Sequence, residues 1–351
     1  MASDLSVARR VGEQSDEHDS FEVEPNGKFE KMIIRLLCEP IAQRLPARVR
    51  PNTISLITHG IAWLTAACAI SSPLLPRPAR TAALVAAGLG TLGSMIGDCL
   101  DGMHARRTNQ CSKLGEMMDH WLDAIIVPLV TLGITIALEM PPWAVVVVST
   151  TATMIYQAQL VLYHHTGKFL HPDTTNGVEA QFGVSIGYVA LAGLLYFVDR
   201  HQAWLDLAIA VLAVGGTLVQ MRCNWFYYLR LGRHLKYHLM FVGMTFAFGG
   251  LYLLGGLSLY EFALCLVFTS FRISGSYVLF TLLRRPFGGM DMGIVVWLLA
   301  IAFAHFLLGP TPTTDGFKAQ ALLPYGACLY MIIRNALDFA RQYERLRPSS
   351  P

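Results

Sequence analysis

The sequence predicts an all-α membrane protein: a polytopic helix bundle of about ten transmembrane helices, preceded by an amphipathic helix that lies on the membrane surface. Of the 351 residues, 54% are hydrophobic and 15% are charged, which is too apolar for an ordinary soluble domain. Apolar runs of about 20 residues, the length that crosses a bilayer, recur along most of the chain. The net charge of +3 is modest, so we expect no nucleic-acid partner.

The first 50 residues differ from the rest of the chain. Residues 1–27 are polar, acid-rich and without periodicity, so we expect a disordered cytosolic tail. The stretch KFEKMIIRLLCEPIAQRL pairs apolar and basic positions at helical spacing, which predicts an interfacial amphipathic helix within residues 28–50. We expect one membrane domain over residues 51–345 and a short tail over residues 346–351.

Ten apolar segments follow, and the third begins weakly because three acids interrupt it. The predicted spans are residues 53–72, 82–105, 115–138, 142–163, 180–198, 203–221, 237–257, 259–282, 290–308 and 319–340. The eighth span contains a charge, Arg272. Because a charge within a bilayer is costly, we expect Arg272 to line a cavity or to pair with an acid such as Glu261 or Asp338.

The positive charges indicate the orientation. Of the 27 Lys and Arg residues, 22 fall on the side that holds the N-terminus, four fall on the other side and one, Arg272, lies inside a span. The four are Arg77, Arg80, Arg200 and Lys318. Positive residues accumulate on the cytosolic side of membranes, so this bias predicts an even number of spans and a cytosolic N-terminus. The membrane would be the endoplasmic reticulum or Golgi in a eukaryote and the inner membrane in a bacterium.

Four aspartates gather at the predicted cytosolic ends of the second and third spans. Asp98 and Asp101 are three residues apart, and Asp119 and Asp123 are four apart, so each pair shares one helix face. The short turn at 108–113 makes the two helices antiparallel neighbours. Four carboxylates that converge away from bulk water repel one another unless cations or protons neutralise them. Two divalent ions would do so, and oxygen ligands suit Mg²⁺ or Mn²⁺.

Two other readings of the same acids remain open at this point. The aspartates can be solvated residues at helix ends or members of structural ion pairs, since Arg106, Arg107 and Lys113 are near in sequence. They can also belong to a cation or proton transporter, because acids within a membrane often mark an ion pathway.

The full spacing resembles the signature of the CDP-alcohol phosphotransferase family. The matching residues are Asp98, Asp101, Gly102, Ala105, Arg106, Gly115, Asp119 and Asp123. The resemblance implies that the four aspartates hold two divalent metals, which bind the diphosphate of a CDP-alcohol. It also implies that the glycines, Ala105 and Arg106 seat the nucleotide, with weaker contributions from Asn52 and Ser55 before and within the first span.

The surrounding residues resemble the eukaryotic-type choline and ethanolamine phosphotransferase branch. The similar stretches are RPNTIS (50–55), ARRTN (105–109), LGE (114–116), DH (119–120), VEAQ (178–181) and, more loosely, IRNALDFARQY (333–343). The chain departs from that branch beside the signature. Trp121 and Leu122 occupy positions where that branch usually has small residues. Met103 occupies a position near which that branch usually has a Lys.

The resemblance implies an enzyme, a homodimer, that transfers the phospho-head group of CDP-choline or CDP-ethanolamine to the hydroxyl of diacylglycerol and releases CMP. An alternative keeps the site and exchanges the substrates: CDP-diacylglycerol would react with a polar alcohol. The transporter remains the alternative from another class.

Three residues are candidates to accept the hydroxyl proton. Asp123 is one, although a metal-bound carboxylate is a weak base. His120 lies between metal ligands in sequence and titrates near neutrality. Glu179 lies where the chain re-enters the membrane, and desolvation there favours proton uptake. We expect Glu179 to accept the proton with assistance from His120.

The predicted orientation has a direct test. A glycosylation sequon engineered with a spacer near Glu139 should be glycosylated in a eukaryotic host, because this loop is predicted to lie on the side away from the cytosol. A matched sequon near Arg233 should stay unmodified, as shown by gel mobility before and after deglycosylation. The opposite pattern would refute the orientation.

Overall fold

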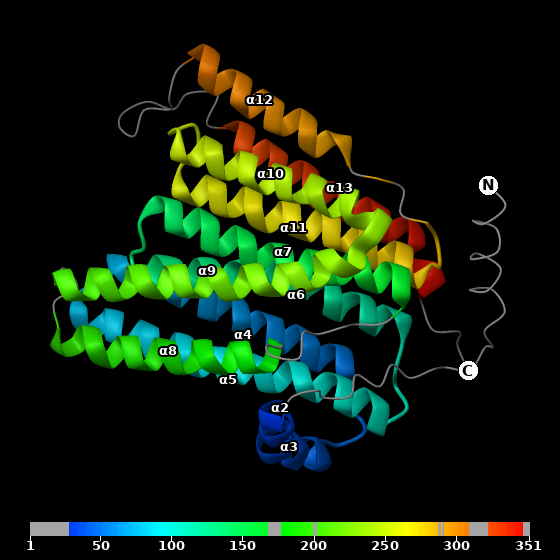
Figure 1. Cartoon of the computed structure of the whole chain (residues 1–351). Helices are drawn as coiled ribbons and strands as arrows, with labels where there is room; N and C mark the ends of the chain where they lie inside the picture. Colours follow the sequence, from blue (N-terminus) through cyan, green and yellow to red (C-terminus); the bar gives the residue numbers. More distant parts are fainter. Residues whose placement is uncertain are drawn as a thin grey trace.

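The computed structural model describes residues 28–167, 177–198, 202–286, 289, 291–308 and 322–346. Within these ranges all regular structure is helical, as predicted. Figure 1 follows the chain from blue to red. The predicted tail 1–27 lies outside the described residues, and so do residues 347–351 of the predicted C-terminal tail.

The N-terminal helix forms in three joined pieces. They are α2 (Lys28–Ile33), the π-helical turn η1 (Ile34–Cys38) and α3 (Glu39–Arg44). Pro40 follows the π turn, and its ring nitrogen cannot donate to the carbonyl of Leu36. The missing bond explains why the helix loosens to π geometry before α3 begins.

This helix packs on the bundle with one face only. Cys38 and Ala42 are buried against Leu100, whereas apolar side chains on other positions are exposed. The exposed ones are Met32, Leu36 and Ile41. A helix that is bound to protein on one side and apolar on its free side suits the surface of a membrane.

Ten longer helices follow in the described part of the chain, one at each predicted span. They are α4 (Pro51–Ser71), α5 (Arg77–Arg107), α6 (Lys113–Ala137), α7 (Pro142–Thr166), α8 (Gly177–Phe197), α9 (Ala203–Leu231), α10 (Leu235–Leu253), α11 (Leu259–Leu282), α12 (Met292–Leu308) and α13 (Leu322–Leu346). Seven of them, α4 to α9 and α11, are long and apolar enough to cross a membrane by length and composition, and α12 is apolar but shorter.

The sixth helix is longer than the span predicted for it. The prediction ended at residue 221, where charged residues begin, but α9 continues to Leu231. The residues between are mostly aromatic or long-chained and tolerate a helix. The helix stops at Gly232, whose φ of 49° lies in the left-handed region.

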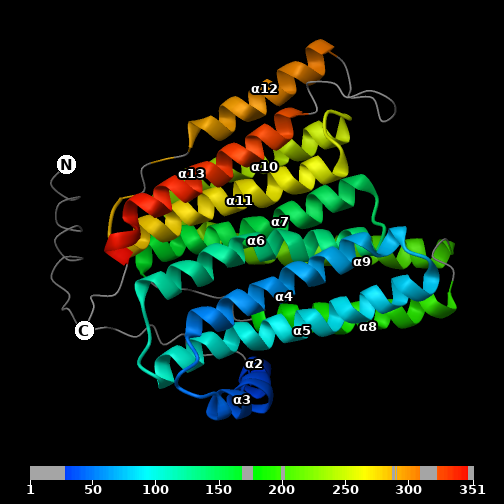
Figure 2. The same cartoon turned by 180° about the vertical axis from the view of Figure 1, so that it is seen from behind.

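The helices stack so that α6 lies between two groups. On one side α6 packs on α4, which with α5 and α8 forms a group covered by α2 and α3. On the other side α6 packs on α7 and α11, which contact α9, α10 and α13. Figure 2 shows the same order from behind, with α12 outermost. Helix α6, which carries two of the aspartates, therefore joins the two groups.

Small residues allow the first group to pack closely. A Cβ at Gly97 of α5 would lie 2.1 Å from Thr58 Oγ1 of α4, and one at Gly88 would lie 2.7 Å from Val189 Cγ2 of α8. Ser185 of α8 donates to the carbonyl of Gly88 at 2.7 Å. Such close approach is typical of helix pairs in membranes, and it fixes the depth of α8 relative to α5.

The second group is held by a buried arginine. Arg272 of α11 is 5% exposed and its Nε lies 2.9 Å from Asp291 Oδ2, while its Nη2 lies 2.8 Å from Asp338 Oδ2 of α13. Nη1 also donates to Asn335 Oδ1 at 3.2 Å. The predicted pairing with Asp338 is confirmed. The one with Glu261 is wrong, because Glu261 caps the first turn of α11 through Ser258.

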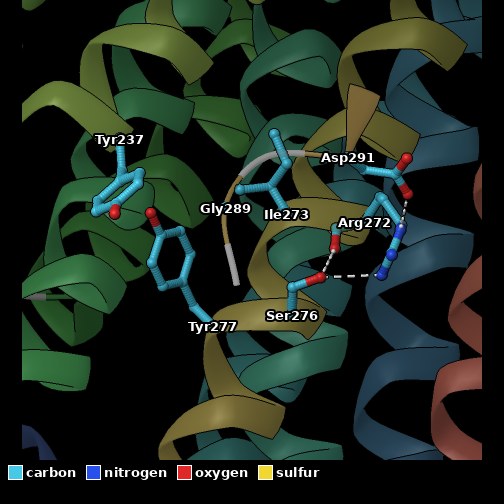
Figure 3. Close-up of a pocket in the computed structure, with 7 residues that line it drawn as sticks. All are labelled: Tyr237, Arg272, Ile273, Ser276, Tyr277, Gly289 and Asp291. Atoms are coloured by element: carbon cyan, nitrogen blue, oxygen red, sulfur yellow. Dashed lines mark hydrogen bonds and ion pairs between the residues drawn. The ribbon is translucent and has the colours of Figure 1, made fainter. Parts of the chain in front are cut away.

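Figure 3 shows part of this network, in which Arg272 pairs with Asp291 and donates to Ser276 Oγ. Arg272 points toward Asp291, and its cavity of about 10 Å³ has room for the centre of one water molecule. Tyr330 and Arg272 both donate hydrogen bonds to the Asp291 carboxylate, at 2.6 and 2.9 Å, and these bonds offset the cost of burying it. Removing one partner of a buried ion pair typically costs about 3–5 kcal/mol, so the network is a strong constraint on α11, α12 and α13.

Candidate active site

Three of the four predicted aspartates converge. Asp98 of α5 and Asp119 and Asp123 of α6 each offer one carboxylate oxygen, and these oxygens lie within 4.8 Å of one another. The carboxylates converge, as the spacing predicted, but the expectation that α5 and α6 pack as neighbours is wrong: each packs on α4, which lies against both.

The fourth aspartate is held beside this group. Asp101 is 6% exposed, and its Oδ2 accepts a hydrogen bond of 2.6 Å from Ser55 Oγ of α4. Ser55 was predicted to face the nucleotide, and in the structure its hydroxyl donates to a carboxylate. The hydrogen bond compensates part of the cost of burying Asp101.

The three converging carboxylates fit a divalent cation. Like charges at this separation repel strongly where water is scarce. One buried oxygen, Asp119 Oδ1, has no hydrogen-bond partner, and an unpartnered buried carboxylate oxygen is costly. A metal ion would satisfy that oxygen and cancel the repulsion, and hard oxygen donors suit a hard cation. The group could therefore hold a metal ion.

The turn between α5 and α6 sets the position of the acids. Ser112 caps α6 by accepting a hydrogen bond of 3.0 Å from the backbone N–H of Gly115. A Cβ at Gly115 would lie 3.0 Å from Asn52 Oδ1, so this glycine lets the start of α4 approach the first turn of α6. Asn109, with φ of 54°, turns the chain between the helices.

The predicted nucleotide residues of α5 face outward from its last turns. Arg106 is exposed, and its guanidinium lies 3.3 Å from the place where a Cβ of Gly102 would be. Gly102 thus leaves room for the arginine to lie along the helix. Ala105 is partly exposed. Met103, where a Lys is usual in the similar branch, lines an open hollow of about 270 Å³ with Arg106.

His120 lies next to the acids but faces α7. Its Nδ1 is 3.8 Å from Asp119 Oδ2, and its ring meets Tyr163 edge-on with centroids 5.6 Å apart. The Tyr163 hydroxyl donates to Glu116, and the Tyr156 hydroxyl donates to the carbonyl of His120. These contacts hold the first two turns of α6 against α7.

Glu179 lies in the first turn of α8 and is partly exposed. Helices α5 and α8 run in opposite directions, and the bond from Ser185 to Gly88 sets their register. A helix rises 1.5 Å per residue, so counting from that bond places Glu179 and Asp98 within about 6 Å of each other along the helix axes. Glu179 is not one of the three converging carboxylates.

One residue near the acids was missed from the sequence. His59 of α4 is 3% exposed, and its Nε2 lies 3.3 Å from Asp123 Oδ1. Its Nδ1 lies 2.7 Å from the carbonyl oxygen of Ser55. The spacing of Asn52, Ser55 and His59, by three and then four residues, could have indicated that all three share the face of α4 that meets the acids.

Trp121, the departure between the third and fourth aspartates, turns away from the acids. Its Nε1 donates to the carbonyl of Phe271 in α11 at 3.1 Å, and its ring stacks on Phe271 with centroids 4.9 Å apart. A Cβ at Gly275 would lie 2.2 Å from this nitrogen, so the glycine provides the slot for the indole. The large side chain therefore packs between helices and leaves the acid cluster open.

A membrane helix bundle with converging carboxylates on two antiparallel helices defines a class of membrane-embedded proteins with a candidate metal centre. Residues 48–221 match the family described as CDP-alcohol phosphatidyltransferase, and the chain belongs to this family, as the aspartate spacing predicted. The match ends within α9, so α10 to α13 lie outside it.

Relatives with curated names fall in the predicted branch. The chain is 36% identical to cholinephosphotransferase 1 of Gallus gallus over 199 residues, which is 54% of this chain and 58% of that protein. It is 33% identical to cholinephosphotransferase 1 of Xenopus laevis over 159 residues, 43% of this chain and 38% of that protein. The human protein of the same name is 34% identical over 109 residues, 29% of this chain and 26% of that protein. The chain thus spans 58% or less of the length of these relatives.

The metal-holding role of the acids can be tested without catalysis. Asp98→Asn, Asp119→Asn and Asp123→Asn should each weaken Mn²⁺ binding to the purified protein by at least about tenfold, because each removes one charged ligand. Electron paramagnetic resonance of free Mn²⁺ measures the affinity. Asp206→Asn, in α9, is the matched control and should bind as the unmodified protein does. Unchanged affinity in all three variants would contradict a metal centre here.

Proposed function

We propose that this chain transfers the phospho-head group of CDP-choline or CDP-ethanolamine to the hydroxyl of diacylglycerol, giving phosphatidylcholine or phosphatidylethanolamine and CMP. The observation that carries the proposal is the convergence of Asp98, Asp119 and Asp123 within the family's spacing. The names of the relatives support choline as the first head group to test. No observation favours CDP-diacylglycerol as donor, or ion transport, over this reaction.

The reaction is a direct transfer. The lipid hydroxyl attacks the β-phosphorus, the bond to the bridging oxygen breaks, and CMP leaves. When bound, two divalent ions, Mg²⁺ or Mn²⁺, would neutralise the negative charge of the diphosphate and of the leaving group. Asp98, Asp101, Asp119 and Asp123 would hold these ions.

The chain contributes binding and alignment. Arg106, exposed at the end of α5, can place its planar guanidinium on two phosphate oxygens. Because Gly102 and Gly115 have no Cβ, the guanidinium of Arg106 and the side chain of Asn52 lie close to the backbone there, where both can contact a bound nucleotide. Alignment of the donor with the acceptor hydroxyl supplies much of the rate in such transfers, because it replaces a random encounter by a fixed geometry.

The proton of the attacking hydroxyl goes to Glu179, with His120 assisting. The position of Glu179 along the helix axis, near that of Asp98, supports this assignment, and Glu179 is not one of the three converging carboxylates. His120 contacts the edge of Asp119 and packs on Tyr163, a position from which it can orient water or the acceptor. A carboxylate at the membrane surface is a suitable general base for a lipid hydroxyl.

The protein would act from the cytosolic face of its membrane as a homodimer. The concentration of positive residues on the side of the N-terminus supports this face, and the acids lie on the same side. Diacylglycerol would reach the site from the bilayer and the CDP-alcohol from the cytosol.

The experiment that tests the function is a transfer assay with purified full-length protein in lipid nanodiscs. Labelled CDP-choline and labelled CDP-ethanolamine are supplied in turn, with and without diacylglycerol. We expect CMP and labelled lipid only when diacylglycerol and Mg²⁺ or Mn²⁺ are both present. Chelation should abolish transfer reversibly. Transfer that needs CDP-diacylglycerol and a free alcohol instead would replace the proposed reaction by the alternative one.

The assignment of the base is tested by two substitutions. Glu179→Gln nearly preserves shape but cannot accept a proton, so turnover should fall by roughly 10²–10⁴ while CDP-alcohol binding is retained. His120→Ala should lower turnover less. Nucleotide affinity is measured beside turnover for each variant. If Glu179→Gln keeps its turnover and His120→Ala loses it, the proton goes to His120; if Glu179→Gln loses binding and rate in proportion, Glu179 is a binding residue.

A further inference from the structure

Helix α4 presents a polar face to the acid-bearing helices. Asn52, Ser55 and His59 occupy successive turns of this face. Asn52 meets Gly115 in the first turn of α6, Ser55 donates to Asp101 of α5, and His59 reaches Asp123 of α6. The first two residues belong to a stretch that resembles the family, whereas His59 lies beyond it. The role of His59 therefore has to be argued from its own contacts.

One ring nitrogen of His59 is bonded within α4, and the other faces Asp123. Its ring is 3% exposed, and Nδ1 lies 2.7 Å from the carbonyl oxygen of Ser55, one turn earlier on the same helix. The carbonyl oxygen of Ser55 and an ionised carboxylate both only accept, so the ring donates from both nitrogens, as the imidazolium ion, and Nε2 is directed outward from α4. Nε2 then lies 3.3 Å from Asp123 Oδ1. The histidine is thus a fixed group that faces one carboxylate oxygen.

Asp123 is less confined than its partner. Its side chain is 31% exposed, against 3% for His59, and a carboxylate at the end of a flexible bond has several orientations open to it. A metal centre needs each ligand oxygen in one place, and groups that hydrogen-bond the ligands usually provide this. An apolar residue would fill the same space at lower cost, because a buried histidine needs hydrogen-bond partners for both ring nitrogens. The presence of His59 here therefore indicates a role beyond packing.

We infer that His59 is a positioning residue for Asp123: through Nε2 it holds the carboxylate in the orientation in which it converges with Asp98 and Asp119. The inference rests on the metal-holding part of the proposed function and not on which head group is transferred. It also assigns α4 a part in the metal centre, since Ser55 and His59 fix one carboxylate from each of the two acid-bearing helices.

The test compares variants of His59 that differ in reach. His59→Gln keeps an N–H group that extends as far as Nε2, whereas His59→Asn ends near the position of Nδ1 and His59→Leu has no donor. Loss of a group that orients a metal ligand costs about 10–100-fold in affinity, so Mn²⁺ should bind about that much more weakly to the Leu and Asn variants. The Gln variant should recover most of the affinity. The control is Thr65→Val, further along α4, which replaces a buried hydroxyl without a partner and should bind as the unmodified protein does.

A double-mutant cycle separates positioning from a general loss of structure. If His59 acts through Asp123, His59→Leu should weaken Mn²⁺ binding markedly in the unmodified protein and little further in Asp123→Asn. Affinity is measured on folded, full-length protein without nucleotide, so failure of head-group transfer would not affect the result. Equal Mn²⁺ affinity of the Gln, Asn and Leu variants, or fully additive losses in the cycle, would overturn the inference. If the Leu variant does not fold, the comparison of Gln with Asn decides.

Discussion

The constraint on which the structure depends is the cost of placing several carboxylates in an apolar bundle. An unpaired charge in such surroundings is expensive, and acids that face one another add repulsion to that cost. The chain meets the constraint twice, in different ways. In the middle of α11, Arg272 supplies the positive charge, with Asp291 and Asp338 as its partners. Within the described residues, the recorded ion pairs of Asp119 and Asp123 are with histidines, and no lysine or arginine is paired with them.

This difference separates a structural cluster from a candidate metal site. The cluster of Arg272, Asp291 and Asp338 becomes neutral when Arg334, whose Nε lies 3.7 Å from Asp291 Oδ2, is included, and it ties α11 to α13 and to the start of α12. The cluster of Asp98, Asp119 and Asp123 could hold a cation, because the excess of negative charge that makes its burial costly also favours the binding of a divalent ion. The surrounding hydrogen bonds from Ser55 and His59 lower the cost of burial without cancelling the charge.

The sequence alone was sufficient for the parts of the molecule that depend on local pattern. Apolar runs located ten helices because a span must keep its backbone bonded and its surface apolar over its whole length. The spacing of the aspartates located the acid cluster because helical geometry places residues three or four apart on one face. The end of α9 was misjudged, since the charged residues after 221 mark the membrane surface but do not end a helix; Gly232 does.

Partners that are distant in the chain could not be predicted in the same way. His59 and Asp123 are 64 residues apart, and a single histidine in an apolar run carries no sign of what it meets. The pairing of Asp291 was not predicted for a related reason. Asp291 lies between helices, where an acid is usually solvated, yet Arg272 and Tyr330 both donate hydrogen bonds to it. Ser55 was expected to face a ligand because its stretch resembles a ligand-binding one, whereas the fold gives its hydroxyl a carboxylate to hold.

Trp121 shows how α11, which lies outside the residues that match the family, affects the candidate site. It lies on α6 between Asp119 and Asp123, and its indole occupies a slot in α11 that Gly275 leaves open. The next residue after its stacking partner Phe271 is Arg272, which is fixed by two ion pairs. The position of α6 is therefore determined from both sides: α4 holds Asp123 through His59, and α11 holds the neighbouring Trp121. Because a shift of α6 would move two of the three converging carboxylates together, the C-terminal helices and the N-terminal ones jointly set the geometry on which metal binding depends.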